Sequence, residues 1–125
     1  EAHRKWSDEA LKADGFIVIT NEYNHAPSPI IKNAIDYLKA HWGKKPVAIM
    51  SHGGVMGGGR AAEHLRQVFA ELYAMTIREH MSVHHVYAQF DESGKLKDEA
   101  VTGDIAKFMD LLLWWTNALK IARAG

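Results

Sequence analysis

The stretch Phe16-Ile17-Val18-Ile19 (FIVI) decides the fold class of this chain. Four consecutive apolar residues predict a strand buried on both faces, and such strands belong to parallel sheets that helices cover on both sides. Before it, residues Lys5 to Ala13 carry apolar side chains at helical spacing, which predicts a short helix that Gly15 ends. After it, residues Thr20 to Ser28 have a composition that favours neither a helix nor a strand.

The same strand-and-helix unit recurs along the chain. A helix is expected from Pro29, and Val47 to Met50 predicts a second buried strand. A glycine-rich loop then leads into another helix, and a third, weaker strand is expected within Val83 to Phe90. The last helix is expected from about Asp104 to Arg123. This alternation predicts a single α/β domain over residues 1–125, with right-handed crossovers.

Two features predict that this domain needs a further covering surface. The strand Phe16–Ile19 has the composition of a central strand, which needs a neighbour on each edge, yet only one further strand is placed to pair beside it. The run Leu111-Leu112-Leu113-Trp114-Trp115 is apolar on every side of its helix, which predicts contacts on more than one face. We therefore expect a homo-oligomer, with a dimer as the default, or a further N-terminal segment.

The composition excludes several classes of protein. The chain has 125 residues, 15 basic and 15 acidic side chains, and no cysteine. A net charge of zero provides no electrostatic footprint for nucleic acid or an anionic membrane, so neither partner is expected. The absence of cysteine excludes disulfide scaffolds, cysteine-ligated zinc and thiol catalysis. The apolar runs are much shorter than the roughly 20 residues that a membrane span requires, and the expected location is the cytoplasm.

Two unusual loops follow the two predicted strands, at the edge where open α/β sheets bind ligands. The first contains Asn21 to Asn24, and the second is the glycine-rich run Ser51 to Arg60. Glycines let a backbone approach a ligand closely and leave amide groups free to donate, so the amides of Gly53 and Gly54 are the expected donors. Together the loops suit a flat heteroaromatic ligand. The alternative for the second loop is a plain flexible turn.

Other motifs favour no separate chemistry. The pattern Gly57-x-Gly59-x-x-Ala62 formally satisfies the dinucleotide fingerprint, but it lies too far after the strand to form the tight turn of that motif. Arg60 stands where a Walker A motif would have its Lys-Ser/Thr ending. His84 and His85 are adjacent and would face opposite sides of a strand, so no metal site is expected.

Several spaced motifs run through nearly the whole chain: Ala13-Asp14-Gly15-Phe16, Thr20-Asn21-Glu22-Tyr23-Asn24-His25, Lys32-Asn33-Ala34-Ile35-Asp36, Lys45-Pro46-Val47-Ala48, Ser51-x-Gly53-Gly54 and Gly58-Gly59-Arg60-Ala61. In these motifs the chain closely resembles the NADPH-dependent FMN reductase family of flavodoxin-like proteins. The resemblance implies a flavodoxin-like parallel sheet with helices on both faces. It also implies an oxidoreductase in which NADPH or NADH passes a hydride to bound FMN, and FMN passes electrons to a small-molecule acceptor such as a flavin or a quinone.

The resemblance further implies the residues of the site. The Glu22-Tyr23-Asn24 loop would hold the ribityl chain and the edge of the isoalloxazine ring, and backbone amides of the second loop would line its pyrimidine end. Arg60 is expected to orient the first loop by pairing with Glu22, and His52 is the candidate for contact with nicotinamide or the acceptor. No catalytic residue is assigned, because hydride transfer to a flavin needs no protein acid or base. The expected cofactor-binding residues are Asn21, Glu22, Tyr23, Asn24, Ser51, His52, Gly53, Gly54 and Gly57.

The chain departs from the family pattern in two respects. Asn21 stands where the family usually has proline. The first strand and phosphate-binding loop of the family have no counterpart here, so this chain is expected to be the C-terminal part of the domain, without its first two strands. A phosphate typically takes several charge-assisted hydrogen bonds of roughly 1.5–3 kcal/mol each, so FMN affinity is expected to fall on the order of 10³–10⁶-fold unless a separate N-terminal fragment supplies the loop.

Two other functions remain open. A flavin-binding electron carrier without NAD(P)H activity usually has a strongly acidic surface, and the balanced charge of this chain disfavours it. A cofactor-free interaction module or fragment would keep the flavodoxin-like fold without binding FMN. A visible spectrum with and without added FMN distinguishes that module from both flavin-binding proteins.

Overall fold

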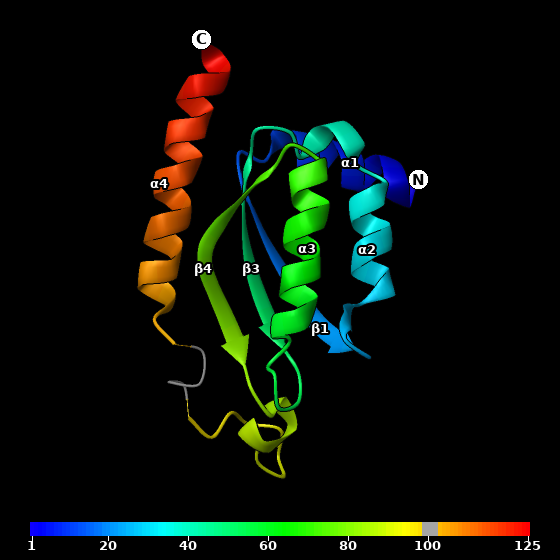
Figure 1. Ribbon diagram of the computed structural model, residues 1–125, viewed down its shortest axis with the longest axis vertical. Coiled ribbons are helices and arrows are strands. Elements are labelled where there is room, and N and C mark those ends of the chain that lie inside the picture. Colours follow the sequence, from blue (N-terminus) through cyan, green and yellow to red (C-terminus); the bar gives the residue numbers. More distant parts are fainter. Residues whose placement is uncertain (99–102) are drawn as a thin grey trace.

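The computed structural model describes residues 1–98 and 103–125 (Figure 1). Its sheet has four strands in the order β2-β1-β3-β4. The strands β1 (Phe16–Tyr23), β3 (Pro46–His52) and β4 (Met75–Val83) are parallel, and the short β2 (Ala26–Pro27) pairs antiparallel with the end of β1. The predicted α/β fold with a mostly parallel sheet between helices is confirmed.

Helices cover the two faces of the sheet unequally. On one face lie α1 (Ala2–Lys12), α2 (Pro29–Asp36) and α3 (Gly59–Glu71), with a short 3-10 helix η1 (Lys39–His41) beside α1. On the other face, α4 (Ile105–Ala124) packs on β3 and β4 (Figure 1). Its bounds agree with the helix expected from the sequence.

Each face has its own apolar core. Between the sheet and the first three helices, Val18 and Ile49 pack with Leu65, Phe69 and other buried residues. Between the sheet and α4, the buried residues are Ala48, Ile77, Met81, Phe108 and Leu112. β3 contributes to both cores, as a strand buried on both faces must.

The prediction of a third strand within Val83 to Phe90 was wrong. The strand β4 ends at Val83, and residues Val86–Gln89 form the 3-10 helix η2. Only Ile77 and Met81 of β4 are buried, and a bulge separates them, because the register with β3 shifts between Val47 and Ile49. The bulge and the polar residues inside it hide the alternating pattern by which strands are found in a sequence.

The segment Thr20 to Ser28 was expected to be neither helix nor strand, and this was wrong in part. β1 continues to Tyr23 and turns back into β2 through Asn24 and His25. Both turn residues have positive φ, 48° and 77°, which matches the two-residue hairpin turns favoured by twisted strands. β1 therefore extends beyond the apolar run because its backbone stays paired with β3 and then with β2, although the side chains there are mostly polar.

One edge of β1 is largely open. Along Phe16 to Asn21 this strand pairs with β3 on one side, while on the other side β2 reaches only Glu22 and Tyr23 in the described residues. Helix α4 lies over β3 and β4, so the side chains of Ile17 and Ile19 on β1 stay 41% and 57% exposed. The prediction that Phe16–Ile19 is buried on both faces was therefore wrong for this face, where an apolar strip of the sheet meets solvent.

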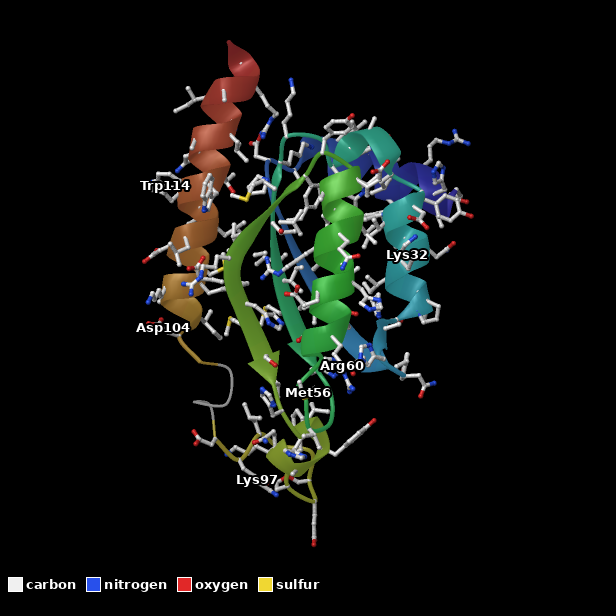
Figure 2. All side chains as sticks on the ribbon, in the orientation of Figure 1. Lys32, Met56, Arg60, Lys97, Asp104 and Trp114 are labelled. Atoms are coloured by element: carbon white, nitrogen blue, oxygen red, sulfur yellow. The ribbon has the colours of Figure 1, made fainter. Side chains whose placement is uncertain are left out.

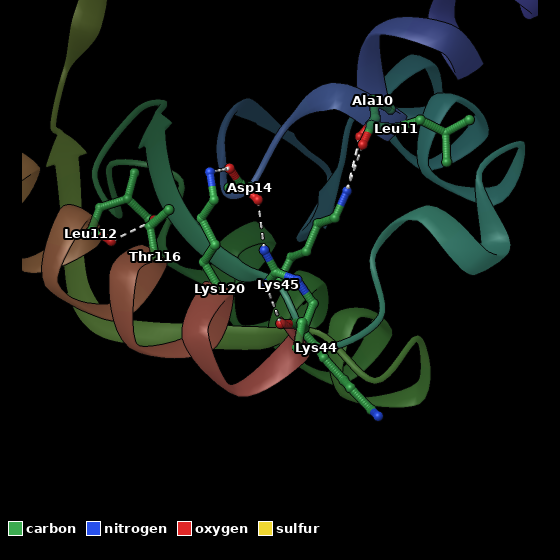
Figure 3. A network of polar contacts seen from close by, with 9 residues as sticks. Ala10, Leu11, Asp14, Lys44, Lys45, Leu112, Thr116 and Lys120 are labelled. Carbon is green, nitrogen blue, oxygen red and sulfur yellow. Dashed lines mark hydrogen bonds and ion pairs between the residues drawn. The ribbon is translucent and has the colours of Figure 1, made fainter. Parts of the chain in front are cut away.

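Helix α4 is held to the rest of the molecule by a polar network at the end of the sheet where the strands begin (Figure 3). The carboxylate of Asp14, just before β1, accepts from Lys120 Nζ at 2.6 Å and from an Arg123 guanidinium nitrogen at 2.8 Å. Arg123 also donates to the carbonyl of Lys44. These contacts connect the C-terminal helix to both loops that precede the central strands.

The apolar run within α4 is only partly covered. Phe108 and Leu112 are buried against the sheet, whereas Leu113 and Trp114 are 50% and 62% exposed. Figure 2 shows Trp114 on the side of α4 that faces away from the strands. None of the helices in the described part of the chain is long and apolar enough to span a membrane.

Candidate functional site

The two loops singled out in the sequence lie at one edge of the sheet. β1 and β3 are parallel, and their register places Asn21 beside His52 and Thr20 beside Ser51. The glycine-rich loop begins directly after β3 and leads into α3 below the ends of the strands (Figure 1). The carboxyl ends of two parallel strands therefore bring together polar side chains more than twenty residues apart in sequence.

The β1–β2 hairpin is fixed to the start of α3 by a charged pair. The Glu22 side chain is only 7% exposed, and its carboxylate lies 2.5 Å from a guanidinium nitrogen of Arg60. The same carboxylate accepts from the backbone N–H of Arg60 at 3.2 Å, where the positive end of the helix dipole adds to the attraction. The expected pairing of Glu22 with Arg60 is confirmed. Beyond this anchor, Tyr23 projects with 58% of its surface exposed.

The carbonyl groups of the glycine-rich loop are all satisfied from within the protein. Gly54 O accepts from His85 N at 2.8 Å and from Gly57 N at 3.2 Å, and Gly57 O accepts from two serine hydroxyls. The remaining acceptor–donor pairs are Gly53 O with Val86 N, Val55 O with His84 Nδ1, and Met56 O with Gly59 N. Most of these donors come from β4 and from the segment that follows it.

The amide groups of the same loop are mostly uncommitted. Within residues 1–98 and 103–125, the N–H groups of Gly54, Val55, Met56 and Gly58 have no hydrogen-bond partner. The amide of Gly53, expected to face a ligand, instead donates to Val83 O at 3.1 Å, because it continues the pairing of β3 with β4. The loop thus turns acceptors inward and leaves donors free, an arrangement chemically suited to an electron-rich ligand edge.

Two glycines of this loop are required by its conformation. Gly57 and Gly58 have φ of +56° and +81°, where other residues are strained. A Cβ on Gly57 would lie 2.2 Å from the Ser82 hydroxyl, and one on Gly58 would lie 2.7 Å from the Ser51 Cβ. By contrast, Gly54 and Gly59 have nothing within 4 Å of the position of a Cβ, so that side of the loop is open.

Ser51 lies beneath the loop. Its hydroxyl is buried and donates to Gly57 O at 2.7 Å, and it lies 2.8 Å from His80 Nε2. Burial, with a further contribution from the nearby Arg66 guanidinium, holds the pKa of His80 below its ordinary value of 6.5. Arg66 itself donates to the carbonyls of Ile77 and Arg78 in the bulge of β4, which fixes the strand just before His80.

The sequence analysis missed three residues that shape this site: His80, Ser82 and His84. Ser82 donates to Gly57 O at 2.9 Å, and His84 Nδ1 lies 2.7 Å from Val55 O. Their spacing of two residues is the signal that was available, since alternate residues of a strand share a face. In the described part of the chain, no three or more His, Asp or Glu side chains are grouped so that they could hold a metal ion.

Comparisons with known proteins agree on one family. The model of NADPH-dependent FMN reductases matches residues 1–88. The chain is 36% identical over 119 residues to the probable NADPH:quinone oxidoreductase 1 of Oryza sativa subsp. japonica, which covers 90% of this chain and 60% of the rice protein. It is 29% identical over 128 residues to a 2-hydroxy-1,4-benzoquinone reductase of Burkholderia, covering 97% of this chain and 70% of that protein. The chain therefore spans only part of the length of these relatives.

A solved structure shares the fold. The flavoenzyme NAD(P)H:(acceptor) oxidoreductase FerB of Paracoccus denitrificans superposes with a TM-score of 0.64 at 24% identity. The superposition covers 94% of this chain and 68% of FerB.

Proposed function

Because the chain belongs to the NADPH-dependent FMN reductase family, we propose that it acts in an NAD(P)H-dependent oxidoreductase that uses FMN and reduces a small acceptor of the quinone or flavin type. The names of its relatives point to quinones as the class of acceptor. One observation carries the proposal: a glycine-rich loop at the carboxyl edge of a parallel sheet turns its carbonyls inward and leaves four amides free.

The residues present fit a flavin ring. The pyrimidine end of a flavin carries two carbonyl oxygens and one ring nitrogen that accept hydrogen bonds, and the free amides of Gly54, Val55 and Met56 are donors. When bound, FMN supplies the uptake and release of hydride. The loop amides would favour negative charge that develops on the ring edge, since fixed donors act strongly where water is excluded.

The polar edge formed by β1 and β3 would orient the ring. Asn21 and His52 lie side by side and are half-buried, so each can offer a polar group to the ligand without first being ordered. Tyr23 and Asn24 belong to the hairpin that the Glu22–Arg60 pair fixes. We propose that this hairpin borders the ring and ribityl chain, and that His52 contacts nicotinamide or the acceptor.

The phosphate of FMN requires a further element. We propose that a polypeptide segment containing a strand pairs with the open edge of β1 and brings the phosphate-binding loop, either within a longer chain or as a separate N-terminal fragment. Two features of β1 support this segment: the edge of Phe16 to Asn21 that faces away from β3 has no partner strand in the described residues, and Ile17 and Ile19 are exposed. The additional length of the relatives supports it as well. The intact mass of the native protein tests the proposal: a single species of this chain alone, with no companion polypeptide, would refute it.

We further propose a cytoplasmic homo-oligomer. The partly exposed apolar side chains of α4, among them Leu113 and Trp114, offer a surface for a second copy. Sedimentation of the purified protein distinguishes a dimer from a monomer.

The function is tested by ligand binding and turnover measured together. Purified protein is titrated with FMN and with riboflavin, which lacks the phosphate, while quenching of flavin fluorescence is followed. NADPH oxidation is then measured with and without a benzoquinone. We expect quinone-dependent NADPH oxidation that requires FMN, and tighter binding of FMN than of riboflavin where the phosphate loop is present. A protein that binds neither flavin would instead be the cofactor-free module.

A further inference from the structure

We propose that His84, Ser82 and Ser51 are positioning residues for the ligand: they hold two carbonyl groups of the glycine-rich loop so that the amides of Met56 and Gly58 are fixed in orientation before the flavin binds. This inference rests on the proposed function of the loop as a flavin site. It assigns a role to two residues, His84 and Ser82, that lie outside the loop and need not touch the flavin.

The argument begins with the geometry of the peptide bond. All peptide bonds in the described residues are trans, so the C=O of each residue points opposite to the N–H of the next. His84 Nδ1, 2.7 Å from Val55 O, therefore directs the Met56 amide away from the His84 ring. The hydroxyls of Ser51 and Ser82, 2.7 Å and 2.9 Å from Gly57 O, direct the Gly58 amide in the same way.

The accounting of protons around Gly57 is complete. Each serine hydroxyl has one proton, and both are donated to the two lone pairs of Gly57 O. The contact of 2.8 Å between Ser51 Oγ and His80 Nε2 then requires that His80 donates from Nε2. The carbonyl of Val55 accepts, so His84 carries a proton on Nδ1. In this arrangement the Ser82 proton goes to Gly57 O, so the 3.3 Å contact between Ser82 Oγ and His84 Nε2 carries no proton. Rotation of either peptide would break at least one of the bonds to Val55 O and Gly57 O.

The glycines of the loop agree with this role. A Cβ on Gly53 would lie 3.0 Å from the nitrogen of Gly58, so a side chain at position 53 would crowd the amide that the serines orient. A Cβ on Gly57 would collide with the Ser82 hydroxyl and the His84 ring, at 2.2 Å and 2.8 Å. The loop thus has no side chain at the positions that the serine hydroxyls and the His84 ring approach.

The His84 ring allows a clean test because it is exposed and contributes to neither apolar core. His84→Leu removes the donor to Val55, whereas His84→Asn places an amide nitrogen near the position of Nδ1. His3→Leu makes the same change at an exposed position of α1, outside both the loop and the hairpin, and serves as the matched control. A neutral hydrogen bond contributes enough for us to expect about 3- to 10-fold weaker FMN binding in His84→Leu, with recovery in His84→Asn.

A measurement without ligand separates this inference from the proposed function. In NMR spectra of the flavin-free protein, we expect His84→Leu to move the amide signal of Met56 and leave that of Gly54, whose peptide is held by Val86. An unchanged Met56 signal, or failure of His84→Asn to restore signal and affinity, would overturn the positioning role. Wild-type protein that binds no FMN would refute the proposed function, while the amide signals would still decide the orientation.

Discussion

At the scale of single residues, the candidate site depends on which carbonyls and amides of the glycine-rich loop already have hydrogen-bond partners within the protein. The glycine-rich loop could present carbonyls or amides to a ligand, and its sequence favours neither. Hydroxyl and imidazole donors from neighbouring strands take up the carbonyls of Val55 and Gly57, so amides remain. Gly57 is buried, and its carbonyl left unpaired would cost about 1–3 kcal/mol, so the inward orientation of this peptide persists without a ligand.

The conformation of the loop predicts a contrast between neighbouring glycines. Gly58→Ala places a Cβ within 3 Å of Ser51 at a φ of +81°, and we expect the free energy of unfolding to fall by about 2 kcal/mol or more. Gly59→Ala is the control, because its Cβ meets nothing within 4 Å, and we expect a change of less than about 1 kcal/mol. Urea denaturation measures both values. Equal losses in the two variants would contradict the loop conformation described here.

His80 predicts a dependence of stability on pH. Because folding lowers the pKa of His80, the unfolded chain takes up the proton first, and stability falls as the pH drops through the ordinary value of 6.5. Arg66 and His84 disfavour the charged form and Glu63 favours it. His80→Gln keeps a donor for Ser51 but does not titrate. We expect the loss of melting temperature between neutral and mildly acidic pH to be smaller in this variant than in the wild type; parallel curves would show that His80 contributes nothing.

At the scale of elements, the hairpin, the loop and α3 form one mechanical unit. The Glu22–Arg60 pair fixes the hairpin to the first turn of α3, and that helix begins directly after the loop. Figure 2 shows Arg60 and Met56 together at this end of the molecule. Because the two sides of the site share one anchor, a change in the hairpin is transmitted to the loop.

Removing the charge of this anchor tests the unit. Glu22 is 7% exposed and bonds both the side chain and the backbone of Arg60, so we expect Glu22→Gln to lower the free energy of unfolding by about 1–2 kcal/mol. Glu63→Gln is the control, since its pair with Arg66 is 72% exposed on the glutamate side and such pairs contribute less than about 1 kcal/mol. Thermal and urea denaturation give both values, and a larger loss in the control would contradict this account.

At the scale of the whole molecule, the polar network that holds α4 and the candidate site lie at opposite ends of the sheet. The Asp14 network ties α4 down where the strands begin, and the candidate site occupies the edge where they end (Figures 1 and 3). Between them, Ile17 and Ile19 leave one strip of the sheet uncovered. Covering an isoleucine fully contributes about 1.5–3 kcal/mol, so an element docked on this strip would be held firmly.

A charge on this strip tests whether the assembled protein covers it. We expect Ile19→Lys to weaken FMN binding by at least about 10-fold, because it would block the strand-bearing segment proposed to complete the site. Ile30→Lys is the control, on a side chain that is 78% exposed and belongs to α2, which packs on the other face of the sheet. Fluorescence titration with FMN measures both. Equal affinities in the two variants would show that the strip stays uncovered.

The sequence alone determined the layers of this protein and the place of its site. Runs such as Phe16–Ile19 and Val47–Met50 predict parallel strands, and both runs form them. The burial on both faces that they also predict holds for β3, whereas β1 leaves Ile17 and Ile19 exposed. Parallel strands then bring their carboxyl ends to one edge, so Asn21 and the glycine-rich loop could be placed together before the fold was seen. The Glu22–Arg60 pair was implied by the resemblance to the FMN reductase family, and the structure contains it.

Only the tertiary structure decided where β4 lies and which atoms of the site are free. The bulge in β4 breaks the alternation between Ile77 and Met81, and nothing local signals it. Whether a loop amide is free depends on which groups from other elements reach the adjacent carbonyls. The Gly53 amide donates to Val83 O, while the amides of Gly58 and Met56 keep no hydrogen-bond partner in the described residues, because Ser82 and His84 contact the carbonyls of the same peptides. Hydrogen bonds between distant segments depend on their positions in space, and a linear pattern of residues does not contain those positions.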